Sequence, residues 1–187
     1  VFIGLFSVYG AVIEGWFNLY MVAAFWVLAV FFGIVVSRKW SPAHLNPAVT
    51  FGFAVSGENI GWKDAFLLIT GQLVGAFLAA LTIYLLFGSG VLEYELANDL
   101  VKGAKGSIRT AMVFGEFYPN PASDVKNAPT WLAALLEGGG TFILMISIFI
   151  SIHKIRSKNL VALVIGLTVG VLIVVVAPYT QAGFNPA

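Results

Sequence analysis

Long apolar runs alternate with short polar stretches along most of this chain. A helix needs about 20 residues to cross a bilayer, and runs of about that length or more extend over Asn18–Ser37, Trp62–Phe87, Pro129–Ile152 and Asn159–Ala177. Val1–Ile13 is apolar but shorter, and we expect it to be the second half of a truncated span. The pattern predicts an all-α membrane protein.

A polar stretch, Ser41–Thr50, interrupts this pattern after the first complete span. Pro47 has a preset φ angle and no N–H, so it suits the first position of a helix, with Asn46 before it as the cap. The residues that follow, Val49–Ser56, are moderately apolar but too few to cross a bilayer. The stretch therefore predicts a re-entrant half-helix, which enters the membrane and ends part-way.

The tripeptide Asn46-Pro47-Ala48 has two further copies in the chain. One of them, Asn185-Pro186-Ala187, again follows an apolar run and predicts a second helix start of the same design. Two such starts, one in each half of the chain, are what an inverted repeat in a membrane needs. The other copy, Asn120-Pro121-Ala122, lies in the polar stretch Gly88–Pro129 with Ser123 and Asp124 behind it, and we interpret it as a plain turn.

Basic residues in short loops predict orientation, because such loops stay on the cytoplasmic side. They gather around the first Asn-Pro-Ala and between the last two spans, at Arg38, Lys39, Lys63, Lys154, Arg156 and Lys158. The long polar stretch mixes both charges and is expected to be external, so the two half-helices enter from opposite faces. The chain then divides into a first half (1–87), an external loop (88–129) and a second half (130–187).

Composition supports a membrane protein and excludes several classes of function. The 187 residues are 59% hydrophobic and 10% charged, whereas soluble domains carry about 25% charged residues. A net charge of +1 leaves no basic stripe for nucleic acid. Without cysteine there is no thiolate site, and no His, Asp or Glu cluster has the spacing of metal ligands. We therefore expect no metal and no cofactor.

The paired Asn-Pro-Ala pattern, with Ala43-His44-Leu45 before its first copy and Val49-Thr50 after it, resembles the aquaporin (major intrinsic protein) family. The resemblance implies a right-handed bundle of six spans, about five of them present here, with two re-entrant half-helices in an inverted repeat and a homotetrameric assembly. It also implies that residues 1–187 form one channel domain that lacks the start of the first span and everything after Ala187. The motifs Phe117-Tyr118-Pro119-Asn120-Pro121 and Gly183-Phe184 resemble the glycerol-facilitator branch.

The resemblance also assigns roles to single residues. Counting back from each paired asparagine places the selectivity constriction at Trp26, Ile173 and Ala182, and the arginine of the constriction would follow Ala187. Bacterial glycerol facilitators pair the tryptophan with glycine and phenylalanine, so isoleucine and alanine leave the solute open. The resemblance adds backbone carbonyls to the pore lining, at Pro42, Ala43, His44, Gln181, Ala182 and Gly183.

Glu137 is an ionisable residue inside a span, which by default points to function. A proton relay would need a second buried acid or a basic partner, and the sequence supplies neither. We expect its carboxylate to accept backbone N–H groups of the second re-entrant segment, as in the family, with Gln72 as a helper. His44 is expected at the cytoplasmic mouth or as a spacer, and His153 as a solvated loop residue.

These features predict a passive channel rather than an enzyme, in a multi-pass protein of the plasma (inner) membrane. The expected solutes are glycerol and other small neutral molecules, with water. A water-selective channel, or one for urea and similar solutes, is the nearest alternative. A coupled secondary transporter also uses broken helices in inverted repeats, and a non-conducting adhesion or scaffold protein would leave the paired motif unexplained.

Overall fold

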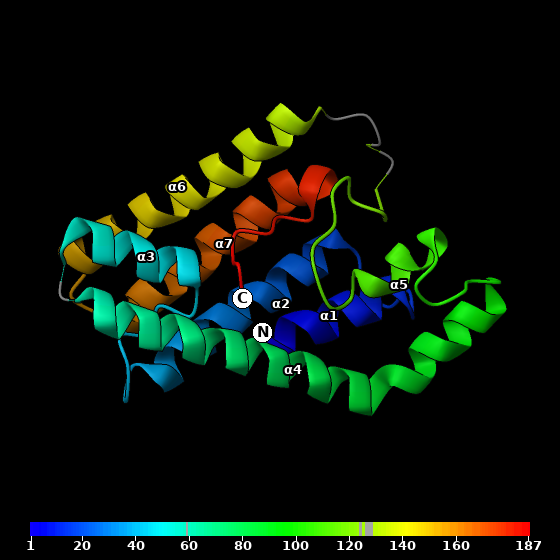
Figure 1. The fold of residues 1–187 in the computed structure, drawn as a ribbon. Coiled ribbons are helices and arrows are strands. Elements are labelled where there is room, and N and C mark those ends of the chain that lie inside the picture. Colours follow the sequence, from blue (N-terminus) through cyan, green and yellow to red (C-terminus); the bar gives the residue numbers. More distant parts are fainter. Residues whose placement is uncertain (59, 124, 126–128) are drawn as a thin grey trace.

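The computed structural model describes residues 1–58, 60–123, 125 and 129–187, and all the regular structure in them is helical (Figure 1). In chain order the elements are α1 (Phe2–Val12), α2 (Leu19–Ser37), α3 (Pro47–Ser56), α4 (Trp62–Ala97), the 3₁₀ helix η1 (Lys105–Ser107), α5 (Ile108–Ala111), α6 (Thr130–Lys154) and α7 (Lys158–Thr180). Among the described residues, α2, α4, α6 and α7 are long and apolar enough to cross a membrane. The predicted all-α class is confirmed.

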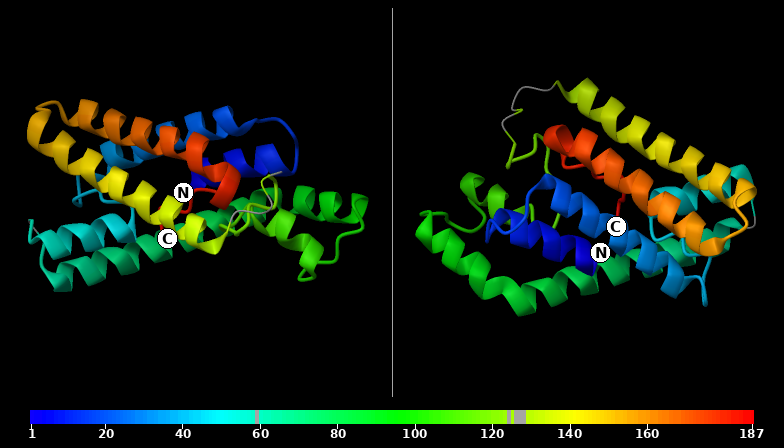
Figure 2. Two further views of the ribbon diagram at one scale, coloured as in Figure 1. Left: turned by 90° about the horizontal axis from the view of Figure 1, so that it is seen from above. Right: turned by 180° about the vertical axis from the view of Figure 1, so that it is seen from behind.

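The helices pack as a bundle with α6 and α7 along one edge, α4 along the opposite edge, and α1 and α2 between them (Figures 1 and 2). The backbones of α2 and α7 come very close, because Gly166 and Gly170 place no side chain between them. A Cβ at Gly166 would lie 2.8 Å from the carbonyl oxygen of Val27. Small residues at a spacing of four let two spans approach in this way.

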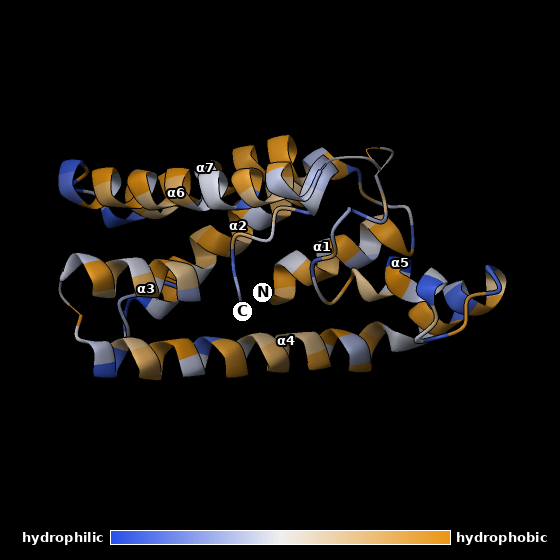
Figure 3. Ribbon diagram, turned by 45° about the horizontal axis from the view of Figure 1, so that its top comes forward, coloured by the Kyte–Doolittle hydropathy of each residue, from blue (hydrophilic) through white to orange (hydrophobic). Residues whose placement is uncertain are grey.

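The outer faces of the long helices are apolar, and polar residues gather in the connections at their ends (Figure 3). Large side chains remain exposed there, including Phe66 at 71% and Leu85 at 73% on α4. Soluble monomers rarely expose continuous apolar surface of this kind, whereas lipid chains solvate it. The outer surface of the bundle therefore fits a bilayer.

The first half-helix forms as the sequence predicts. α3 has Asn46 as its N-cap and Pro47 in its first position, and it ends after 10 residues. Gly57 follows with a left-handed φ of 71°, which stops a helix at little steric cost in glycine. α3 is too short to cross a bilayer, so the chain must turn back at Gly57 into α4.

α4 does not end where the sequence predicts. The polar stretch was expected to leave the span at Phe87, but the helix continues to Ala97. The added turns are held by tertiary contacts: Val91 is buried, and the buried carboxylate of Glu95 accepts a hydrogen bond from Thr110 Oγ1 at 2.6 Å. The loop that we expect to be external (the external loop) is correspondingly shorter than the sequence suggests, and its residues Asp124 and Lys126 lie outside the described part of the chain.

α7 also continues past its predicted end, from Ala177 to Thr180, with Pro178 inside its last turn. Proline has no N–H, so it removes one hydrogen bond from the helix that contains it. The final turn of α7 is thus less well held by its own backbone than an ordinary helix end. It leads directly into the second Asn-Pro-Ala segment.

The contact between α1 and α4 gives a direct test of why α4 continues. A Cβ at Gly90 would lie 2.1 Å from the Tyr9 hydroxyl oxygen, and Tyr9 is 3% exposed and donates to Glu14 Oε1 at 2.5 Å. Since this tyrosine cannot move freely, we expect Gly90→Ala to lower the free energy of unfolding by about 1–3 kcal/mol. Thermal unfolding of the purified protein in detergent measures the change.

The matched control is Gly88→Ala, two positions away on the same helix. A Cβ at Gly88 would meet the Tyr84 ring at an ordinary 3.6 Å, so alanine should be neutral there or stabilise the helix by up to about 1 kcal/mol. Equal unfolding temperatures for the two variants would contradict the packing argument.

Candidate functional site at the paired Asn-Pro-Ala segments

Two asparagines far apart in the sequence bind each other's segments. Asn46 Nδ2 donates to the carbonyl oxygen of Phe184 at 2.9 Å, and Asn185 Nδ2 donates to that of Leu45, also at 2.9 Å. The two bonds are equivalent, because each amide binds the carbonyl of the residue just before the other asparagine. Such reciprocity is what an inverted repeat produces at the contact between its two halves.

Each asparagine also caps its own segment. Asn46 Oδ1 accepts the backbone N–H of Ala48 at 2.8 Å, and Asn185 Oδ1 accepts that of Ala187 at 3.1 Å. A carboxamide has one oxygen and two N–H hydrogens. Capping uses the oxygen and the crossing bond uses one hydrogen, so each asparagine keeps a hydrogen with which to bind a further oxygen atom.

Both asparagines border a cavity of about 1050 Å³. Its walls come from α1, α2, α4, α6 and α7, from both Asn-Pro-Ala segments and from part of the external loop. The helices contribute mostly apolar side chains, among them Leu5, Val22 and Leu144. Polar side chains come from the two segments and also from α5 and the loop after it, which supplies Glu116 and Asn120. An apolar wall with a few placed polar groups is typical of sites for small molecules.

The three residues predicted to form the constriction lie together on the wall of this cavity. Ile173 on α7 is 6% exposed and belongs to a small apolar cluster against which Trp26 of α2 and Ala182 pack. The Trp26 ring fits over Gly4 of α1, where a Cβ would lie 2.3 Å from it. The structure thus brings the three side chains into one cluster, and their role in selectivity stays a prediction.

The chain before each of the paired Asn-Pro-Ala tripeptides (the first box, residues 46–48, and the second box, residues 185–187) adopts backbone angles that L-residues rarely take. Ala43 and Leu45 before the first box have φ values of 60° and 54°, and Gln181 and Ala182 before the second have 67° and 66°. Each such residue costs about 1–3 kcal/mol, so surrounding contacts must hold these segments in place. Ala43 and Ala182 both lie three residues before their asparagine, so this one position follows the inverted repeat, whereas Leu45 and Gln181 have no equivalent in the other segment.

The residues whose backbone carbonyls the resemblance assigns to the pore lining border two cavities. Ala182 and Gly183 line the large one, as does Gln181. Pro42 and Ala43 line a smaller cavity of about 270 Å³ beside the α3–α4 turn. His44 borders both cavities, which suits its expected place at a mouth.

Glu137 on α6 binds the second segment. Its Oε1 accepts the backbone N–H of Gly183 at 3.0 Å and also the hydroxyl of Thr180. This is the kind of contact expected of Glu137, a backbone N–H of the second re-entrant segment bound by a buried carboxylate. The bond holds the chain immediately after Ala182.

Gln72 is not the helper of Glu137 that the sequence suggested. Its Nε2 donates to Thr50 Oγ1 at 2.9 Å, because α4 packs against α3 and carries Gln72 to the first box. The buried Thr50 hydroxyl also donates to the carbonyl of Asn46 at 3.1 Å and lies 3.2 Å from His44 Nδ1. Thr50 is thus a supporting residue that sequence reasoning missed, although its place directly after the first box was a signal.

The external loop binds the end of α7 through the third Asn-Pro-Ala. Asn120 does form a turn, since its Oδ1 accepts the N–H of Ala122 at 2.9 Å. Its Nδ2, however, donates to the carbonyl of Ala177 at 2.6 Å. The interpretation as a plain turn is therefore incomplete, because the same side chain also docks the loop on α7.

Glu116, in the same loop, lies on the cavity wall. A Cβ at Gly183 would lie 3.1 Å from Glu116 Cγ, and 3.9 Å from Glu137 Oε2. Although the Glu116 side chain reaches the open cavity, the protein atoms around its carboxyl exclude water and Glu137 adds negative charge, which together raise the pKa of Glu116 to about 8.

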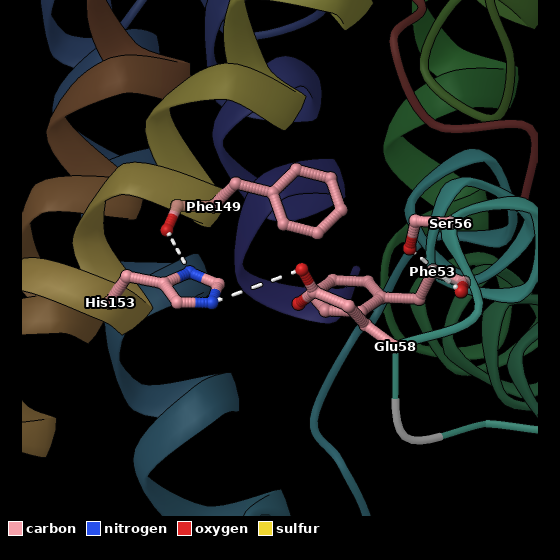
Figure 4. A network of polar contacts seen from close by, with 5 residues as sticks. All are labelled: Phe53, Ser56, Glu58, Phe149 and His153. Carbon is pink, nitrogen blue, oxygen red and sulfur yellow. Dashed lines mark hydrogen bonds and ion pairs between the residues drawn. The ribbon is translucent and has the colours of Figure 1, made fainter.

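At the other end of the bundle, His153 was expected to be a solvated loop residue. It is exposed, but it lies in the last turn of α6 and has two polar neighbours. Its Nδ1 lies 2.8 Å from the carbonyl oxygen of Phe149, and its Nε2 lies 3.8 Å from Glu58 Oε1 beside the smaller cavity (Figure 4). The Phe53 ring packs on that of Phe149, with centroids 4.9 Å apart.

Among the described residues, no group of three His, Cys, Asp or Glu side chains is placed to hold a metal ion.

Comparison with known proteins places this arrangement in a family. The model of the family described as "Major intrinsic protein" matches residues 1–187. A glycerol uptake facilitator protein of Pseudomonas aeruginosa is 35% identical over 174 residues, which cover 91% of this chain and 60% of that protein. The propanediol uptake facilitator PduF of Citrobacter freundii is 34% identical over 173 residues, 91% of this chain and 62% of that protein.

A solved structure agrees with the sequence relatives. The X-ray structure of the aquaglyceroporin from Plasmodium falciparum aligns with a TM-score of 0.69 at 25% identity, over 99% of this chain and 72% of that one. This chain spans about 60% of the length of the curated relatives named above. With a family match over all of its residues, this chain belongs to the major intrinsic protein family, whose members are multi-pass integral membrane proteins.

Proposed function

We propose that the protein is a passive transmembrane channel for glycerol and other small neutral solutes, and that water passes as well. The observation that carries this proposal is the crossed pair of Asn46 and Asn185 on the wall of a largely apolar cavity. A molecule with hydroxyl groups along a short carbon chain matches such a wall. The relatives named as glycerol and propanediol facilitators support the same class of solute.

The field at the crossed asparagines favours neutral solutes over cations. α3 begins at Asn46, and a helix start carries about half a positive charge from its unpaired N–H groups. The second segment begins with the same cap at Asn185. A positive field at this point opposes cations and protons that move along a file of water, while the asparagine N–H groups bind and orient the oxygen atom of a neutral solute.

The residues at the constriction supply the apolar side of the path. Trp26 and Ile173 present carbon surface to a passing solute, whose hydroxyl groups then face the carbonyls of the segments before the two boxes. No step in this passage forms or breaks a covalent bond, so the proposal is a channel and not an enzyme. Ala182 packs in the same cluster, and its small side chain leaves more room for a solute than a larger one would.

Two alternatives remain outcomes of the test. A water-selective channel, or one for urea and similar small solutes, would use the same crossed asparagines with a different constriction. A coupled secondary transporter would need an ionisable residue that is free to change charge at mid-depth. The contacts of Glu137 argue against it, because its Oε1 is engaged by Gly183 and Thr180 in bonds that hold the chain. Glu116 is the neighbouring acid that the sequence did not indicate, and flux under a proton gradient tests it.

We also propose a plasma-membrane homotetramer with the α3–α4 turn on the cytoplasmic side. The basic residues at that end of the bundle support this orientation. The small-residue ridge Gly71-x3-Gly75-x3-Ala79 supports assembly, because a Cβ built at Gly71 or Gly75 would have no described atom within 4 Å apart from the neighbouring residues and backbone of its own helix. A ridge of this kind on an exposed face suits close contact with another membrane helix.

Solute flux tests the proposed function. The full-length protein is reconstituted in lipid vesicles, and stopped-flow light scattering follows volume changes under sucrose, glycerol and urea gradients. We expect glycerol to enter without any ion gradient, and faster than into protein-free vesicles. Fast water flow with no glycerol entry would show a water channel instead, and flux that requires a proton or sodium gradient would show a transporter.

Glu137→Gln separates a structural role from a proton relay. A carboxylate accepts stronger hydrogen bonds than an amide oxygen, so we expect the change to lower stability by about 1–3 kcal/mol and to reduce the yield of assembled protein. Because the amide oxygen of glutamine can still accept the N–H of Gly183, the fraction that does assemble should keep its ratio of glycerol to water permeability. Size-exclusion chromatography measures the yield of assembled protein, and vesicle assays measure the permeability ratio. The control is Glu93→Gln, at an exposed position on α4. Normal assembly with abolished transport would point to a relay.

A further inference from the structure

The third Asn-Pro-Ala makes two hydrogen bonds to the end of α7. Asn120 Nδ2 donates to the carbonyl oxygen of Ala177 at 2.6 Å, and the backbone N–H of Asn120 donates to that of Tyr179 at 3.3 Å. The last carbonyls of a helix have no donor within the helix itself, and Pro178 weakens this turn further. The backbone N–H of Gln181 already donates to the Ala177 carbonyl at 3.0 Å, so the loop adds a second donor to that carbonyl and one to the carbonyl of Tyr179.

The side chain of Gln181 adds a third bond between the same two segments. Its Oε1 accepts the backbone N–H of Phe117 at 2.7 Å. Gln181 itself has a φ of 67°, and Ala182 one of 66°, conformations that cost about 1–3 kcal/mol each. A strained turn keeps its shape only if its surroundings hold it, and the bond from Phe117 does so.

Ala182 lies between two anchors as a result. On one side, the external loop holds Ala177, Tyr179 and Gln181. On the other, Glu137 holds Gly183. Ala182 packs in the cluster that contains Ile173 and Trp26, so the position of this cluster depends on both anchors.

We propose that Asn120 and Gln181 are positioning residues that set the width of the constriction. They hold the end of α7 and the strained turn after it, so that Ala182 and Ile173 keep a fixed distance from Trp26. This inference rests on the proposed function and goes beyond it, since it assigns solute discrimination partly to two residues outside the predicted constriction.

Asparagine is the residue that this contact requires at position 120. Its Nδ2 donates to Ala177 while its Oδ1 accepts the N–H of Ala122 at 2.9 Å. Aspartate has the same shape but only acceptor oxygens, so it would keep the turn and place a negative oxygen against the carbonyl of Ala177. Asn120→Asp therefore removes the hydrogen bond from residue 120 to the carbonyl of Ala177 and retains the turn.

The chain contains a matched control for this change. Asn98 Nδ2 donates to the carbonyl of Tyr94 at 2.8 Å at the exposed end of α4, which is the same kind of bond in a place far from Ala182 in the chain. Asn98→Asp should lose one bond of equal type without effect on solute discrimination.

The experiment measures permeability to a four-carbon polyol and to glycerol in vesicles that contain the full-length protein or a variant. We expect Asn120→Asp to raise the polyol-to-glycerol ratio about five-fold, the change that one lost hydrogen bond can produce, with normal assembly. Asn98→Asp should leave the ratio as in the wild type. A ratio that stays unchanged in Asn120→Asp, or that shifts equally in both variants, overturns the proposal.

Gln181 provides a second pair of variants. Gln181→Glu keeps an acceptor oxygen for the N–H of Phe117, whereas Gln181→Met has similar length and no such acceptor. We expect Gln181→Met to shift the polyol-to-glycerol ratio in the direction of Asn120→Asp, and Gln181→Glu to shift it less. Equal ratios for the two variants would contradict a role for this hydrogen bond.

Amide hydrogen exchange distinguishes failure of this inference from failure of the proposed function, because it needs no solute. Exchange at the backbone of Phe117 should be faster in Asn120→Asp than in the wild type or in Asn98→Asp. Unchanged exchange would contradict the claim that Asn120 holds the loop against α7, even if glycerol passes. Faster exchange in a protein that does not conduct glycerol would support the role of Asn120 in holding the loop against α7 and would refute the proposed solute.

Discussion

The reciprocal bonds of Asn46 and Asn185 are the constraint on which the rest of this structure depends. Each asparagine satisfies a carbonyl of the opposite segment and the first N–H of its own. Lipid chains offer no hydrogen bonds, so a backbone group left unpaired against them costs several kcal/mol. Non-helical chain is tolerated at this depth where it is buried in protein or lines a cavity. Here the two segments complete each other's hydrogen bonds, and the walls of the bundle bring them together.

The two segments are supported by different chemistry despite their equivalent bonds. The first is held by neutral groups, since Thr50 binds the carbonyl of Asn46 and accepts the amide of Gln72. The second is held by the carboxylate of Glu137 and by the external loop. The inverted repeat thus fixes the geometry at the asparagines, while each half has its own means of holding it.

Local features of the sequence predicted local features of the structure well. The Asn46-Pro47 pair marks the start of α3, because a cap and a preset φ act within one turn of a helix. Glu137 was singled out as an acid inside an apolar span, and the family resemblance linked it to the second segment, where it accepts the N–H of Gly183. The end of α4 was missed because Gly88 and Gly90 favour a loop by local propensity, whereas packing on Tyr9 favours helix.

The sequence by itself determined the apolar spans, the two capped helix starts and the family, since each depends on residue type at close spacing. The tertiary structure decided which groups meet. Asn46 and Phe184 are 138 positions apart and still share a hydrogen bond of 2.9 Å. Gln72 faces the first box rather than the second because α4 packs on α3, and Asn120 binds α7 rather than forming only a turn. A hydrogen bond requires its partners within about 3 Å, and only the packing of whole helices sets distances of that order between residues so far apart.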